Sequence, residues 1–104
     1  MNRMTPEEAA AKLAAGEAKL LDVREPDEIT SASIEGAQCI PMGEIPDRID
    51  ELDRDQPLII MCHLGGRSAK VCEYLLSQGF TDISNLSGGI TAWAETDPDA
   101  VNIR

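Results

Sequence analysis

The chain has 104 residues, with 19 acidic and nine basic side chains and a formal net charge of −10 at pH 7. This length supports one hydrophobic core, so we expect a single domain over residues 1–104. Nucleic acids and anionic membrane surfaces require clustered Lys and Arg, so the acidic balance argues against either as a partner.

The N-terminal region and the cysteine content bear on the cellular compartment of the protein. Charged residues interrupt every apolar run there, namely Glu7, Glu8, Lys12 and Glu17. Neither a signal peptide nor a membrane span is therefore expected. The chain has three cysteines, an odd number, and ample aliphatic residues for a core, which favours reduced thiols over a disulfide framework. We expect a cytoplasmic protein.

The first predicted helix has a strong start signal. Thr5 is placed as the N-cap, Pro6 occupies the first helical position, and Glu8 completes a capping box. Gly16 is a plausible end of this helix. A strand is predicted next, over residues 20–23.

The middle of the chain continues the alternation of strand and helix. Residues 37–40 are predicted to form a strand. A helix should follow, because Ile45, Ile49 and Leu52 fall at i, i+4 and i+7 and so share one face. Residues 53–56 form a polar loop.

The second half has the same order. Residues 57–61 form an apolar run that predicts a buried strand, and residues 68–76 have helical spacing up to a stop at Gly79. A strand over 82–86 and a short helix over 90–94 complete the pattern. Such alternation predicts an α/β fold with a mainly parallel sheet, in which ligands gather at the carboxyl ends of strands. Residues 97–104 are expected to form a loose tail.

The loop after the strand at 57–61 is the strongest candidate site. Cys62 ends the apolar run, Gly65 and Gly66 allow a tight turn, and Arg67 precedes the helix. Unpaired N–H groups at a helix start attract negative charge and lower the pKa of a thiol, as does a nearby cation. Most cysteines after a buried strand are merely small core residues, and Gly-Gly pairs mark ordinary turns. The combination nevertheless favours a nucleophile in an anion-binding loop.

Three further motifs accompany this loop. They are Leu20–Glu28, Ile34–Ala37 with Ile40–Pro41, and Asn85–Trp93. Together with the loop they resemble the rhodanese (sulfurtransferase) domain over nearly the whole chain. One departure is Ala32–Ser33, where members often have Gly-His, and it leaves His63 as the only histidine.

The resemblance implies a rhodanese-like fold, with a central, mainly parallel five-stranded sheet flanked by helices on both faces. It also implies that Cys62 takes sulfur from thiosulfate or a similar donor as a persulfide and passes it to cyanide, a thiol or a sulfur-accepting protein. The substrate-binding residues would be the rest of the loop, namely His63, Leu64, Gly65, Gly66, Arg67 and Ser68. No metal or organic cofactor is required by this chemistry.

Two other functions remain open. A persulfide carrier or docking domain that serves one partner protein would need the same loop. A phosphatase or arsenate reductase also uses Cys and Arg around an anion, but related phosphatases have Cys-x5-Arg, whereas Cys62 and Arg67 give Cys-x4-Arg.

Structural roles are expected for the other conspicuous residues. Asp22 and Arg24 are expected either to cap a loop or to form an ion pair near the site. Cys39 and Cys72 are expected in the core, and Trp93 should pack the last helix onto it.

Overall fold

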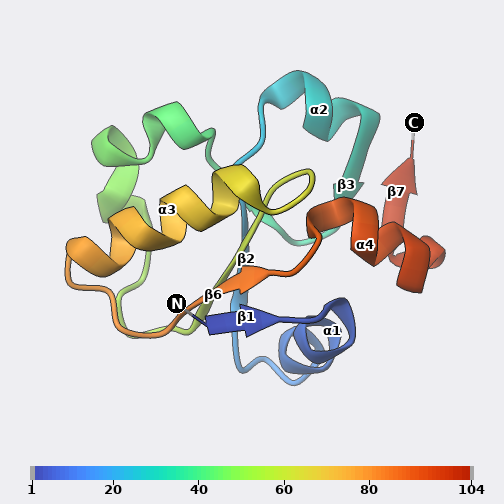
Figure 1. The fold of residues 1–104 in the computed structure, drawn as a ribbon, viewed down its shortest axis with the longest axis horizontal. Coiled ribbons are helices and arrows are strands. Elements are labelled where there is room, and N and C mark those ends of the chain that lie inside the picture. Colours follow the sequence, from blue (N-terminus) through green and yellow to red (C-terminus); the bar gives the residue numbers. More distant parts are fainter. Residues whose placement is uncertain (1, 104) are drawn as a thin grey trace.

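The computed structural model describes residues 2–103 and has a five-stranded parallel sheet at its centre (Figure 1). The strands, in spatial order, are β1 (Asn2–Met4), β6 (Ile83–Leu86), β5 (Leu58–Met61), β2 (Lys19–Asp22) and β4 (Gln38–Cys39). Every neighbouring pair is parallel. The predicted α/β class with a parallel five-stranded sheet is confirmed.

Helices cover both faces of this sheet. The α-helices are α1 (Pro6–Ala14), α2 (Pro26–Ser31), α3 (Gly66–Ser77) and α4 (Gly89–Thr96). Three short 3₁₀ segments are η1 (Met42–Glu44), η2 (Pro46–Glu51) and η3 (Pro98–Ala100). A second, two-stranded antiparallel sheet pairs β3 (Ala32–Ile34) with β7 (Val101–Ile103).

Strand β5 shows why the core has two halves. Successive side chains of a strand point to opposite faces, and all four residues of β5 are buried. Ile60 packs in the cluster that includes Leu75 of α3, whereas Ile59 and Met61 pack in the cluster that includes Trp93 of α4. A continuous apolar run therefore places β5 at the centre of the fold.

The predicted start of the first helix is confirmed in detail. The Glu8 N–H donates to Thr5 Oγ1 over 3.2 Å, and the Thr5 N–H donates to Glu8 Oε1 over 3.0 Å. Pro6 occupies the first turn, where its missing N–H costs nothing. Gly16 follows the helix with a φ of 71°, a conformation that favours glycine.

The predicted helix around residues 45–52 is wrong in type. The chain forms 3₁₀ turns there, and Arg48 has non-helical angles (φ −118°, ψ 16°) that break η2. The apolar spacing was nevertheless meaningful, because Ile45 and Leu52 are buried in the same cluster and Ile49 packs against it. Burial of the side chains does not require a regular α-helix between them.

The expected loose tail is also wrong. Residues 98–103 form η3 and then β7, in which Val101 lies opposite Ile34 and Ile103 opposite Ala32. Val101 is 7% exposed and belongs to the core cluster around Trp93. Arg104 lies outside the described residues.

Two of the expected core positions are confirmed and one is wrong. Cys72 and Trp93 are buried, but Cys39 is exposed, because β4 is a two-residue strand at the edge of the sheet. Within the part of the chain that the structure describes, no helix is long and apolar enough to cross a membrane.

Candidate active site

Cys62 lies at the carboxyl end of β5, immediately before the turn that leads into α3. β5 is flanked by β6 and β2, so the cysteine stands over the middle of the sheet. The residue is 1% exposed and its thiol is free. The buried sulfur of Cys62 therefore lies at the carboxyl ends of the strands, where ligands bind in open α/β folds.

The turn folds around the sulfur of Cys62. Gly65 has a φ of 117°, which L side chains rarely adopt, and its N–H donates to Cys62 Sγ over 3.0 Å. Gly65 is also the N-cap of α3, so the positive end of the helix dipole faces the thiol. The glycine in this position is what lets a backbone donor reach the sulfur.

The side chain of Ser68 also contacts the sulfur of Cys62. Its Oγ lies 3.2 Å from Cys62 Sγ and 2.5 Å from Asn85 Oδ1, so its single hydrogen can be donated to either atom, while Asn85 Nδ2 donates to the Gly65 carbonyl over 3.1 Å. Ser68 and Asn85 are both buried. This network ties α3 and the end of β6 to the turn that holds the sulfur.

These contacts decide the ionisation of Cys62. Burial alone would raise the pKa of the thiol, but hydrogen bonds from the Ser68 hydroxyl and from the backbone N–H groups of Ser68, Gly65 and Leu64 outweigh it. The net effect lowers the pKa of Cys62. Cys72 has no such surroundings, and burial raises its pKa to about 12. The geometry thus favours the thiolate form of Cys62 over that of Cys72.

The first turn of α4 holds the backbone of the loop through two hydrogen bonds. The Ile90 N–H donates to the Cys62 carbonyl over 2.9 Å, and the Thr91 N–H donates to the His63 carbonyl over 3.3 Å. Gly89 makes the close approach possible, because a Cβ at this position would lie within 2.5 Å of both carbonyl oxygens. The turn that precedes α4 therefore holds the backbone of the loop.

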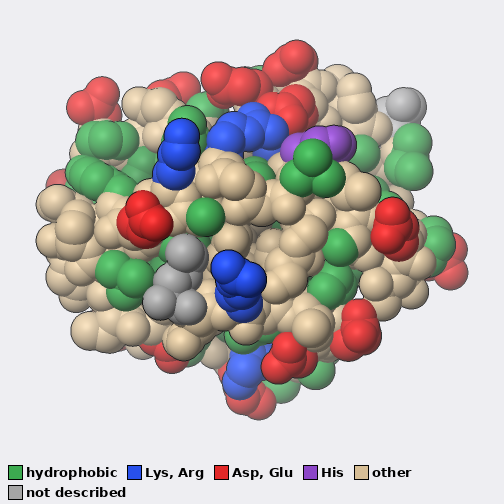
Figure 2. All heavy atoms as spheres, in the orientation of Figure 1, with side chains coloured by type: hydrophobic (Ala, Val, Ile, Leu, Met, Phe, Trp, Pro, Cys, Tyr) green, Lys and Arg blue, Asp and Glu red, His purple; other side chains and the backbone are tan. Residues whose placement is uncertain are grey.

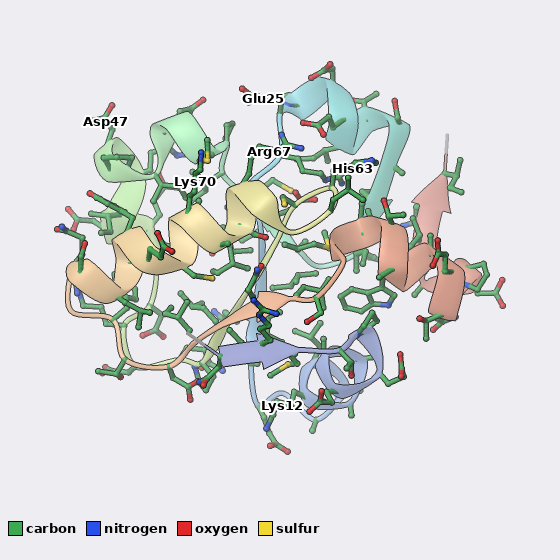
Figure 3. The ribbon with its side chains drawn as sticks, viewed as in Figure 1. Lys12, Glu25, Asp47, His63, Arg67 and Lys70 are labelled. Carbon is green, nitrogen blue, oxygen red and sulfur yellow. The ribbon has the colours of Figure 1, made fainter. Side chains whose placement is uncertain are left out.

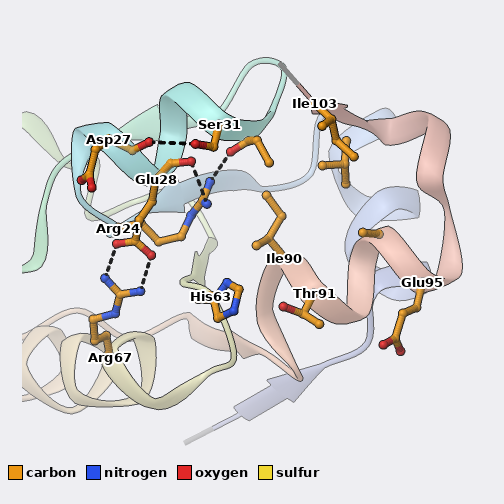
Figure 4. A pocket seen from close by; sticks show the side chains of 13 residues that line it. Arg24, Asp27, Glu28, Ser31, His63, Arg67, Ile90, Thr91, Glu95 and Ile103 are labelled. Carbon is orange, nitrogen blue, oxygen red and sulfur yellow. Dashed lines mark hydrogen bonds and ion pairs between the residues drawn. The ribbon is translucent and has the colours of Figure 1, made fainter.

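The guanidinium of Arg67 binds a carboxylate of α2. Its Nη1 and Nη2 atoms donate to Glu28 Oε1 and Oε2 over 2.6 and 2.8 Å, which makes a bidentate ion pair between α3 and α2 (Figure 4). Arg67 and Glu28 are each about one-third exposed. The hydrogen bond from Arg67 is the main cause that lowers the pKa of Glu28 to about 2. The carboxylate therefore stays charged at neutral pH.

The predicted ion pair between Asp22 and Arg24 is confirmed and is buried. Arg24 Nη2 donates to Asp22 Oδ2 over 2.8 Å and to the Ala32 carbonyl over 2.7 Å, and Nη1 donates to the Glu28 carbonyl over 3.4 Å. Both side chains are at most 2% exposed. This pair joins the end of β2 to α2, and so positions Glu28.

His63 and Leu64 are exposed on the outer side of the loop. In Figure 3, His63 and Arg67 lie at the same end of α3, with Lys70 further along the helix. Figure 2 shows the histidine on the molecular surface, with basic side chains beside it and acidic ones at the rim. The loop thus has a mixed charge environment despite the strongly acidic composition.

A cleft of about 680 Å³ adjoins the loop on the side of α2 and α4. His63, Arg67 and Glu28 line it near the loop, with Ile90 facing them (Figure 4). Val101 contributes further apolar surface. Cys62 itself is not among the residues that line the cleft, whereas its neighbour His63 is.

Some site residues escape prediction from the sequence. Asn85 and Glu28 lie within motifs that the resemblance identifies, yet no local spacing connects either residue with Cys62. They meet the loop through the order of the strands and through α2. Within residues 2–103, no group of three or more His, Cys, Asp or Glu side chains is arranged to hold a metal ion.

Comparison with known proteins agrees with this architecture. The rhodanese-like domain model matches residues 5–96. The chain is 41% identical over 95 residues to a protein named sulfurtransferase from Allochromatium vinosum, covering 90% of this chain and 89% of that protein. It is 36% identical over 99 residues to thiosulfate sulfurtransferase GlpE of Stutzerimonas stutzeri, covering 95% of this chain and 90% of that one.

A solved structure gives the same result. The crystal structure of a rhodanese-like domain protein from Staphylococcus aureus superposes with a TM-score of 0.87 at 34% identity, covering 100% of this chain and 99% of that chain. The protein therefore belongs to the rhodanese-like domain family.

Proposed function

We propose that this protein is a sulfurtransferase that moves a sulfane sulfur, through a persulfide on Cys62, to a thiol or cyanide acceptor. The observation that carries the proposal is the surroundings of Cys62 Sγ, which lies 3.0 Å from the Gly65 N–H and 3.2 Å from Ser68 Oγ at the start of α3. These groups favour the thiolate, which is the reactive form of cysteine. The names of the relatives, sulfurtransferase and thiosulfate sulfurtransferase, support the same reaction.

In the first half of the proposed reaction, the Cys62 thiolate attacks the outer sulfur of thiosulfate. The S–S bond of thiosulfate breaks, its electron pair leaves with sulfite, and a persulfide anion remains on Cys62. The N–H groups of the loop stabilise that anion, because they already point at the position of the sulfur. In the second half, cyanide or a thiolate attacks the outer sulfur, and the Cys62 thiolate returns. The substrate-binding role of residues 63–68 is part of this proposal.

A persulfide carrier that serves one partner protein is the alternative within the same chemistry. The exposed His63 and Leu64 would give such a partner access to the loop. Rapid turnover with small acceptors favours the enzyme, whereas transfer only to a protein favours the carrier. The three free thiols support work in a reducing compartment such as the cytoplasm.

The experiment is a turnover assay with thiosulfate and cyanide that follows thiocyanate formation. We expect activity in the wild type and none above background in Cys62→Ser. Cys72→Ser is the matched control, because Cys72 is also buried but does not lie at the loop. Equal activity of wild type and Cys62→Ser would overturn the proposal.

A further inference from the structure

Arg67 is the cation expected to attract an anionic donor, but it already forms an ion pair with Glu28. Both of its terminal nitrogens bind the carboxylate of Glu28. The other arginine beside the cleft, Arg24, is matched in the same way by Asp22. Both arginines that line the cleft are therefore paired with carboxylates.

The surrounding charge opposes a doubly negative donor. Asp27 lies on α2 beside Glu28 and lines the cleft, Glu95 lines it from α4, and the chain carries a net charge of −10. Repulsion grows with the charge of the donor, so a dianion such as thiosulfate is disfavoured more than a monoanion. The Arg67–Glu28 pair removes the local attraction that would offset this repulsion.

The shape of the cleft favours an organic group on the donor. Ile90, Ala94 and Val101 give it an apolar wall, and its volume of about 680 Å³ exceeds the needs of an inorganic anion. This wall begins next to His63 and Arg67, so it is continuous with the loop. A substituent on the donor would have apolar surface to contact within reach of the site.

We propose that the site prefers an organic sulfane donor with at most one negative charge over thiosulfate, and that Glu28 sets this preference by neutralising Arg67. Organic persulfides and thiosulfonates are donors of this class. The proposal rests on the sulfur transfer proposed above for Cys62. Glu28 acts through Arg67, so it is a positioning and selectivity residue that does not itself touch the transferred sulfur.

Methanethiosulfonate is the probe, because it has a methyl group where thiosulfate has a charged oxygen. The Cys62 thiolate attacks the outer sulfur of either compound and becomes a persulfide anion. The electron pair of the broken S–S bond leaves with methanesulfinate in one case and with sulfite in the other. Total charge is conserved in both reactions, and the sulfur transfer needs no oxidant or reductant.

The test compares kcat/KM for the two donors with cyanide as a common acceptor. In a two-step transfer this parameter reports only the donor half-reaction, so the acceptor does not enter. We expect the wild type to prefer methanethiosulfonate. Glu28→Gln should raise kcat/KM for thiosulfate by about tenfold and change the value for methanethiosulfonate less, because a single charge interacts less strongly with the released Arg67.

The controls separate this effect from a change in overall charge or in folding. Glu28→Gln keeps an oxygen that accepts the Glu25 N–H in the capping box of α2. Asp47→Asn removes one exposed negative charge that does not line the cleft, and among residues 2–103 Asp47 makes no ion pair with Arg67. It should leave the ratio of the two kcat/KM values within about twofold of wild type, since exposed charges act weakly at a distance.

Salt dependence gives a second measurement on the unmodified protein. If repulsion dominates, added KCl should raise kcat/KM for thiosulfate more steeply than for methanethiosulfonate, because screening weakens repulsion. A fall with KCl would show that a free cation attracts the donor, and would overturn the proposal. A donor ratio in Glu28→Gln equal to that in Asp47→Asn would overturn it as well. Failure of both donors to load sulfur onto wild-type Cys62 would overturn the proposed function itself, a result distinct from an unchanged ratio.

Discussion

The backbone N–H of Ile90, in the first turn of α4, donates to the carbonyl of Cys62 over 2.9 Å. A segment 28 positions further along the chain thus fixes the residue that carries the proposed chemistry. With this carbonyl held by α4, the N–H groups of the following turn remain directed at the sulfur. The donors of a helix N-terminus, which are otherwise unpaired, serve here to orient a loop.

Gly89→Ala should disturb the loop from the side of α4. A Cβ would lie within 2.5 Å of the Cys62 and His63 carbonyl oxygens, and the φ of 62° disfavours an L side chain. We expect a loss of about 2–3 kcal/mol in the free energy of unfolding and slower sulfur loading of Cys62. Urea unfolding and single-turnover loading measure the two effects.

Gly16→Ala is the control for that variant. Gly16 has a similar φ of 71°, but a Cβ there would have open space around it. Only backbone strain should remain, which costs about 1 kcal/mol, and loading should be normal. Equal losses in both variants would contradict the proposed role of the close contact at Gly89.

Ser68→Ala should raise the pKa of Cys62, because it removes the side-chain hydrogen bond that favours the thiolate. Sulfur loading at about pH 7 should slow by about tenfold, the equivalent of one hydrogen bond to a charged group. Thiolate absorbance against pH measures the shift. Ser77→Ala, at the far end of α3, is the control and should titrate as wild type. An unchanged titration of Ser68→Ala would contradict the account of the thiol.

Val101→Ala should show that the C-terminal strand is part of the fold. Val101 is 7% exposed in the core cluster, so its truncation should cost about 1–2 kcal/mol. Ile103→Ala, two residues on, removes a side chain that is 76% exposed and should change stability by less than about 0.5 kcal/mol. Urea unfolding of the pair distinguishes a packed strand from a tail, since a tail would make both variants neutral.

The Arg67–Glu28 pair predicts a definite pH dependence. The pKa of Glu28 is about 2, below its ordinary value of 4.5, so the fold favours the carboxylate. Its contribution is complete above about pH 4.5 and is lost as the pH falls towards 2. The difference in unfolding free energy between wild type and Glu28→Gln should be at most about 1 kcal/mol, since the pair is partly exposed, and should vanish over that range. A difference that grew on acidification would contradict this assignment.

The elements that the sequence predicts well have local signals. The capping box at Thr5 and the strand before Cys62 depend on neighbouring residues, and both are found in the structure. The segment after Ile45 shows the limit, because the same apolar spacing is met by 3₁₀ turns. Strands β1 and β7 have three residues each, too few to show a period. They form because a partner strand offers hydrogen bonds.

The candidate site also has a part that depends on neighbouring residues and a part that depends on distant ones. The donors around Cys62 come from the next six residues, so the loop itself could be inferred from glycine placement and a helix start. The partner of Arg67 could not, because Glu28 is 39 positions away and reaches it only through the docking of α2. The exposure of Cys39 was likewise set by its place on an edge strand, which no local pattern announces.

Intact mass of the freshly reduced protein after incubation with a sulfane donor tests the central claim most directly. We expect the wild type and Cys72→Ser each to gain one sulfur atom, with one equivalent of sulfite released when thiosulfate is the donor, and Cys62→Ser to gain none. Addition of cyanide should remove the sulfur. A gain of sulfur by Cys62→Ser equal to that of wild type would contradict the assignment of Cys62 as the sulfur carrier. Absence of any gain with thiosulfate and with methanethiosulfonate would contradict sulfur transfer as the function.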